Sequence, residues 1–116
     1  MKVLLDHCVD RRVGPVLVGH EVLTAAAMGC DALKNGRLLK VAADAGFEVF
    51  VTTDKNLRHE QNLATLPLPG VELHSIDTRL HALIPLLARF EDALVVLRLC
   101  GYVAIHPDGR IERVAP

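Results

Sequence analysis

Short apolar segments alternate with longer segments of mixed polarity along most of the chain. The apolar segments are the right length for single strands and lie at residues 3–5, 20–24, 47–51 and 71–76. The first is apolar without alternation, which is typical of a strand buried on both faces of a parallel sheet. Residues 71–76 alternate instead, which predicts Val71 and Leu73 on one face of the strand and Glu72 and His74 on the other.

The segments between these strands carry helical patterns, at residues 9–18, 25–28, 36–45, 55–63 and 78–99. We expect Asn35 to cap the helix that follows it and Gly46 to end that helix. Proline cannot donate a helical hydrogen bond, so Pro15 should start or break the first helix, and Pro85 should start or kink the longest one.

The end of the chain predicts a β-hairpin. Strand-like residues 102–105 and 111–114 flank Asp108-Gly109, a pair that favours tight turns between antiparallel strands. The alternation of strands and helices before it favours an α/β fold with a mainly parallel central sheet. We therefore expect a single domain over residues 1–116, with the hairpin at one edge of its sheet.

Composition narrows the classes of function. The chain has 116 residues, of which 51% are hydrophobic and 23% charged, and this excludes intrinsic disorder. Aromatic residues make up only 3%, too few for a base-stacking platform. The formal net charge is −1, so any binding of nucleic acid must depend on a local basic patch.

The cysteines and the amino-terminal residues provide evidence on where in the cell the protein is located. Cys8, Cys30 and Cys100 form no CxxC pair and are odd in number, which argues against a disulfide framework and a standard zinc site. Asp6 interrupts the first apolar segment too early for a signal peptide, and no apolar run is long enough to span a membrane. The expected location is the cytoplasm. Cys8 is expected to be a small core residue.

Two aspartates directly follow predicted strands. Asp6 follows the first strand, and Asp54 follows the third after Thr52-Thr53. Sites in open α/β sheets form beyond the carboxyl ends of the strands, where two such carboxylates can converge. Oxygen ligands of this kind suit Mg²⁺ or Mn²⁺, which could activate water and stabilise a phosphodiester transition state. The alternative is that each aspartate only caps the next helix.

Basic residues lie close to these positions in the sequence. A local phosphate-binding patch could include Arg11, Lys34, Arg37, Lys55 and Arg58. The alternative for each is an ordinary solvated surface charge. His7 is expected to be a partly buried, hydrogen-bonded histidine rather than a metal ligand, since neighbouring residues in an extended segment point in opposite directions.

Several segments together resemble a family of small bacterial PIN-like domains of uncharacterised function, related to VapC-type toxin ribonucleases. They are Met1-Lys2-Val3-Leu4-Leu5-Asp6-x-Cys8, Gly19-His20-Glu21-Val22, Leu33-Lys34-Asn35-Gly36-x-Leu38-Leu39, Phe50-Val51-Thr52-Thr53-Asp54-Lys55-Asn56-Leu57, Gln61-Asn62-Leu63 and Leu66-Pro67. The resemblance implies a three-layer α/β/α sandwich and Mg²⁺- or Mn²⁺-dependent ribonuclease activity, with three or four acidic residues at the carboxyl end of the sheet. Asp6 and Asp54 match two of those acids.

Two further acids of the family pattern are missing. His7 stands where the family commonly has Glu, and Arg37 replaces the Glu of the Asn-Gly-Glu-Leu-Leu segment. Asp10 and Asp31 are candidates to compensate. Fewer anionic oxygens weaken divalent binding, and a cation at position 37 favours direct contact with phosphate.

Three functions remain open on this sequence. The first is a metal-dependent ribonuclease, as in the toxin of a toxin–antitoxin pair, with Asn35 and Asn56 orienting ligands or water beside the aspartates. The second is a non-catalytic PIN-like domain that binds a protein partner or nucleic acid. The third, a phosphoacceptor receiver domain, is disfavoured because His7 stands where a second aspartate would be needed. We also expect a homodimer, because helix 78–99 and residues 66–68 offer much apolar surface.

Overall fold

The computed structural model of the chain describes residues 1–30 and 32–115, with the side chain of Asn35 also outside the described part. Six strands form one sheet in the order β2-β1-β3-β4-β5-β6. The strands are β1 (Lys2–Leu5), β2 (Glu21–Thr24), β3 (Val49–Thr52), β4 (Gly70–Leu73), β5 (Tyr102–Ile105) and β6 (Ile111–Arg113). All neighbours pair in parallel except β5 and β6, which are antiparallel. The predicted α/β class, the parallel sheet and the carboxyl-terminal hairpin are therefore confirmed.

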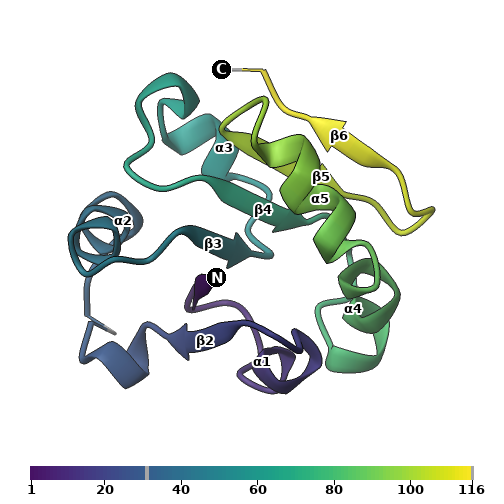
Figure 1. Ribbon diagram of the computed structural model, residues 1–116, viewed down its shortest axis with the longest axis horizontal. Helices are drawn as coiled ribbons and strands as arrows, with labels where there is room; N and C mark the ends of the chain where they lie inside the picture. Colours follow the sequence, from purple (N-terminus) through teal and green to yellow (C-terminus); the bar gives the residue numbers. More distant parts are fainter. Residues whose placement is uncertain (31, 116) are drawn as a thin grey trace.

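Helices cover both faces of the sheet (Figure 1). One face carries α1 (Val13–Val16), α4 (Leu80–Leu87) and α5 (Phe90–Leu97), and the other carries α2 (Asn35–Asp44) and α3 (Leu57–Glu60). Short 3₁₀ turns, η1 (Ala26–Met28) and η2 (Leu63–Thr65), lie in the connections. Because both faces are covered, the central strands can be apolar on both sides.

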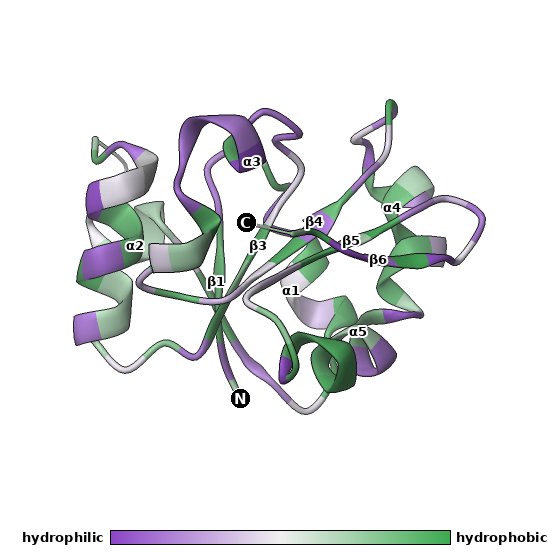
Figure 2. Ribbon diagram, turned by 90° about the horizontal axis from the view of Figure 1, so that it is seen from above, coloured by the Kyte–Doolittle hydropathy of each residue, from purple (hydrophilic) through white to green (hydrophobic). Residues whose placement is uncertain are grey.

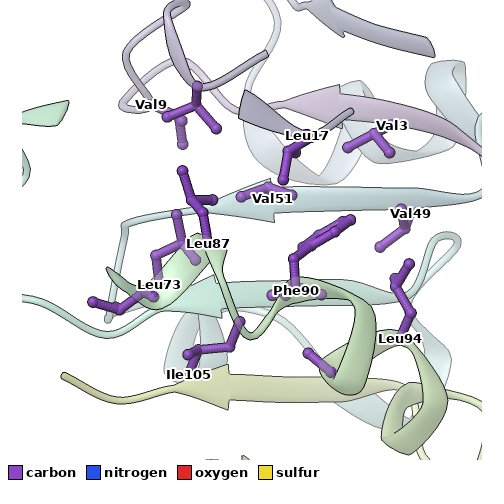
Figure 3. Close-up of a cluster of buried hydrophobic side chains, with 14 of the residues drawn as sticks. Val3, Val9, Leu17, Val49, Val51, Leu73, Leu87, Phe90, Leu94 and Ile105 are labelled. Carbon is purple, nitrogen blue, oxygen red and sulfur yellow. The ribbon is translucent and has the colours of Figure 1, made fainter. Parts of the chain in front are cut away.

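Each face of the sheet has its own hydrophobic cluster. On the first face Val49, Val51 and Phe90 pack together with Leu17, just after α1, and Leu87 of α4, as Figure 3 shows. On the second face Leu38 and Leu39 of α2 pack against Phe50. Gly70 is required beside this ring, because an added Cβ would overlap the ring of Phe50.

The predicted helix over residues 78–99 is two helices rather than one. Pro85 lies inside α4 on its exposed side, and the break falls later, at Ala88 and Arg89. Arg89 Nε donates to the carbonyl oxygen of Gly109 at 3.0 Å, which ties the break to the hairpin turn. The new direction of α5 lets Phe90 enter the core, where it is 1% exposed.

Two smaller expectations also need correction. Asn35 is the first residue of α2 rather than its cap, and the capping position belongs to Lys34, whose side chain makes no capping bond. The polar segment 55–63 contains only the single turn of α3, and η2 begins at its end.

Part of the apolar surface expected to support a homodimer lies in the chain's own core. Leu68, Leu83, Leu86 and Leu94 are buried, whereas Ile84, Val95 and Leu99 are exposed. Self-association stays a prediction. No described helix has the length and apolarity needed to cross a membrane.

Candidate functional site

A row of polar side chains crosses the sheet near the carboxyl ends of its strands. Thr52 of β3 pairs with Glu72 of β4, and Ala104 of β5 stands between Glu72 and Glu112 of β6 in the strand register. Asp6 continues the row on the other side, since it follows Leu5, which pairs with Val51. Residues in register share one face of a sheet, so these groups line the face that α2 and α3 cover.

The hydroxyl of Thr52 connects the two predicted aspartates. It donates to Asp6 Oδ2 at 2.9 Å and accepts from the backbone N–H of Asp54 at 3.0 Å. Thr52 is fully buried and Asp6 is 7% exposed, so this link is fixed in the protein interior. The structure thus brings Asp6 and Asp54 to neighbouring strand ends, as the sequence predicts.

The two carboxylates differ in how many of their oxygens are already used. Asp6 accepts through both oxygens, from the backbone N–H of His7 at 2.8 Å and from Thr52. Asp54 is half-buried, and its Oδ1 accepts from the backbone N–H of Asn56 at 2.9 Å. Asn56 is exposed immediately after this turn. Neither aspartate caps the helix that follows it, since the N-cap residues of α1 and α3 are Arg12 and Asn56. Each carboxylate instead bonds to the backbone of its own loop.

Two carboxylates could bind a hard divalent ion whose remaining coordination positions are filled by water and substrate. Mg²⁺ is usually held by one or two carboxylates together with waters and substrate phosphates, rather than by a full protein cage. Asp6 and Asp54 are the carboxylates at these neighbouring strand ends that could form such a pair. Among residues 1–30 and 32–115, no group of three or more His, Cys, Asp or Glu side chains is placed to hold a metal ion.

Of the two compensating acids named from the sequence, Asp10 does not join this pair. Asp10 accepts from Arg12 Nε and Nη2, the latter at 2.7 Å, and is thereby committed to its own loop. These bonds lower the pKa of Asp10 to about 2. Asp31 lies outside the described residues, as does the side chain of Asn35.

The residues beside Asp6 are more exposed than expected. Cys8 is an exposed free thiol rather than a core residue. Its Sγ lies 3.6 Å from Thr52 Oγ1 and 3.8 Å from Asp6 Oδ2, at the edge of the candidate site. His7 is also exposed, and its Nε2 lies 2.9 Å from the carbonyl oxygen of Leu33. That bond joins the loop after β1 to the segment before α2.

A cavity of about 480 Å³ opens next to this bond. It is lined by His7, Ala32, Leu33, Lys34, Gly36, Glu60 and Gln61. Gly36 lies next to the amide of Gln61 in this lining. Of the predicted phosphate-binding residues only Lys34 lines this cavity, together with Glu60 and Gln61 at the end of α3. Figure 2 shows that α3 is predominantly hydrophilic.

The predicted basic residues fall into two groups. Arg11, Lys34 and Arg37 are exposed and Lys55 is half-buried, and no described carboxylate pairs with any of them. Arg58 is different, because its side chain is only 15% exposed and donates to both oxygens of Glu72, at 3.2 and 2.8 Å. Arg58 can reach a phosphate only if this pair opens.

Glu72 is the centre of a polar network that the sequence analysis did not identify. It is fully buried, and it accepts from Arg58, from the hydroxyl of Tyr102 at 3.0 Å and from His74 Nδ1 at 2.6 Å. Burial, the Glu72 charge and, more weakly, Asp54 raise the pKa of Tyr102 far above its usual range. One feature of the sequence could have revealed this network: Glu72 is an acidic residue within a strand of a sheet that was predicted to be covered on both faces.

A second cavity lies at the opposite ends of β4 and β5. It measures about 650 Å³ and is lined mostly by apolar residues, among them Leu66, Pro69, Leu99, Tyr102 and Val114. None of the predicted site residues lines it.

Comparison of the chain with protein-family models, with curated proteins and with solved structures finds no match.

Proposed function

We propose that this chain is a PIN-like, metal-dependent ribonuclease domain whose active site is the carboxyl edge of the sheet around Asp6 and Asp54. The observation that carries the proposal is the hydroxyl of Thr52, which bonds to the carboxylate of Asp6 and the backbone of Asp54 at once. The parallel sheet with helices on both faces is compatible with a PIN-like α/β/α sandwich. The toxin of a toxin–antitoxin pair is the biological setting that the sequence resemblance implies.

Mg²⁺ or Mn²⁺ bound there would activate water and neutralise charge on the phosphodiester. Asp6 and Asp54 would supply the protein's oxygen ligands, and Thr52 holds the Asp6 carboxylate in one orientation. The backbone N–H of Asn56 fixes Asp54 in the same way. The RNA phosphate would complete the coordination that two carboxylates leave open.

The exposed basic residues would hold the RNA backbone on either side of the aspartates. Lys34 lines the cavity beside His7, and Arg37 lies in the first turn of α2. Lys55 directly follows Asp54. Such contacts position a nucleic acid without reading its sequence.

A second candidate function is binding of nucleic acid or a protein partner without catalysis. The observation that favours it is the basic start of α2, where Arg37 stands in the first turn and no acidic residue is present. A cation at the positive end of a helix is unfavourable by itself and becomes favourable when an anion binds nearby.

Cleavage of a random-sequence RNA pool in the presence of Mn²⁺ distinguishes the two functions. Asp6→Asn and Asp54→Asn should each abolish cleavage while leaving the circular dichroism spectrum unchanged. Asp44→Asn, the same change at an exposed position at the end of α2, is the matched control and should cleave normally. Only a few-fold loss in the folded Asp6 variant would refute the ribonuclease assignment. RNA binding that is unchanged by EDTA, without cleavage, would support the second function.

A further inference from the structure

Two histidines meet at the carboxyl ends of β4 and β5, in the network around Glu72. His74 directly follows β4 and His106 directly follows β5, and their ring centroids are 4.6 Å apart. The backbone N–H of His74 donates to the carbonyl oxygen of Ile105 at 2.8 Å. The sheet therefore fixes the spacing of the two side chains.

A carboxylate orients each of the two imidazoles. His74 Nδ1 lies 2.6 Å from Glu72 Oε2, and His106 Nε2 lies 2.7 Å from Glu112 Oε1. Arg58 pairs with both acids, at 2.8 and 3.5 Å. Since an ionised carboxylate only accepts hydrogen bonds, each neutral imidazole must carry its proton on the nitrogen that faces the acid.

The other nitrogen of each ring therefore carries a lone pair. No described residue bonds to His74 Nε2 or His106 Nδ1, and neither atom is among the fully buried polar atoms that lack a partner. The side chains are 33% and 13% exposed, so both rings reach solvent. Histidines that bind metals characteristically donate their second ring N–H to a carboxylate in this way.

The spacing and the charge also suit a metal ion. A metal–nitrogen bond of about 2.0–2.1 Å places a ring centre about 3 Å from the ion, so two ligating rings have centroids within about 6 Å. The observed 4.6 Å lies inside that limit. Two carboxylates against one guanidinium leave the cluster with one excess negative charge when both imidazoles are neutral.

We propose that His74 and His106 form a two-imidazole site for a borderline divalent transition-metal ion such as Zn²⁺, with Glu72 and Glu112 orienting the ligands. Imidazole nitrogens favour Zn²⁺, Ni²⁺ and Cu²⁺ over Mg²⁺. This site therefore differs in ligand chemistry from the oxygen site of Asp6 and Asp54, and it does not depend on the proposed ribonuclease activity. With two protein ligands, the remaining coordination positions are open to water or to another ligand.

Calorimetric titration of the full chain with Zn²⁺ at pH 7.5 tests the proposal, in a Cys8→Ser background that removes the exposed thiol. We expect one ion per chain, with affinity at least tenfold lower in His74→Ala and in His106→Ala. His81→Ala is the matched control, because this histidine is 68% exposed and lies outside the cluster, and it should bind like the parent. Glu112→Gln should weaken binding about tenfold, and Asp6→Asn should have no effect.

Nitrogen-15 NMR of the imidazoles makes the test independent of variant folding. Before zinc is added, the neutral form of each ring should carry its proton on the nitrogen that faces the acid, Nδ1 in His74 and Nε2 in His106. Zinc should then shift His74 Nε2 and His106 Nδ1 together, in one titration step. The absence of Zn²⁺ binding up to about 1 mM, unchanged affinity in either histidine variant, or zinc shifts at only one of the two rings would overturn the proposal.

Discussion

Removing one partner of the ion pair between Arg58 and Glu72 should be among the most destabilising single changes in this fold, because it leaves a buried charge uncompensated. Glu72 has no exposed surface, and the Arg58 side chain is 15% exposed. Replacing Arg58 with Met keeps much of the side-chain volume and leaves the carboxylate buried without its cation. Breaking a buried pair in this way costs about 3–5 kcal/mol, whereas an exposed pair contributes only about 0–1 kcal/mol.

The remaining contacts of Glu72 place the expected cost within that range. The variant loses the bonds to Glu72 at 3.2 and 2.8 Å and the weaker contact with Glu112 at 3.5 Å. Tyr102 and His74 still donate to Glu72 and offset part of the loss. We therefore expect Arg58→Met to lower the free energy of unfolding by about 3 kcal/mol, the lower end of the buried-pair range.

Urea unfolding followed by far-ultraviolet circular dichroism measures this change. A double variant, Arg58→Met with Glu72→Gln, removes both charges while keeping an acceptor for Tyr102. It should recover most of the loss and lie within about 1–2 kcal/mol of the parent, because the buried charge is gone. A single-variant cost below about 1 kcal/mol, or a double variant as unstable as the single one, would refute the reasoning.

Two further predictions concern other parts of the fold. The pKa of Asp10 is lowered to about 2 by the Arg12 bonds, so its stabilising effect should be complete at neutral pH and disappear as the pH falls from about 4 through 2. The stability gap between the parent and Asp10→Asn should therefore close below about pH 2 in urea titrations, and a constant gap would contradict this. Gly70→Ala should destabilise the protein by about 1–3 kcal/mol, because its Cβ would overlap the buried ring of Phe50; unchanged thermal stability would contradict that packing.

Local sequence signals were sufficient for most of the architecture. Apolar runs and the Asp108-Gly109 turn act over a few residues, and they predict the strands and the terminal hairpin. The break between α4 and α5 could not be predicted from Pro85, since it depends on the contact between Arg89 and Gly109, twenty residues apart. The helical periodicity of a sequence does not indicate contacts between residues so far apart.

The candidate site, too, could be predicted only in part from the sequence. Asp6 and Asp54 could be identified because each directly follows a strand, and strand ends converge in a parallel sheet. Glu72 and Arg58 could not be paired from the sequence, because their contact requires the register between β3 and β4 and the position of α3. Arg58 therefore resembled a phosphate-binding residue, although its charge is directed into the protein.

The proposed function requires that Asp6 and Asp54 hold a divalent ion at the carboxyl edge of the sheet. The decisive experiment is a calorimetric Mn²⁺ titration with a non-cleavable phosphorothioate oligonucleotide present, in a His74→Ala/His106→Ala background that removes the other proposed site. We expect saturable Mn²⁺ binding that disappears in Asp6→Asn and persists in the Asp44→Asn control. Binding of equal strength in Asp6→Asn, or no binding at millimolar Mn²⁺ with the oligonucleotide bound, would contradict it.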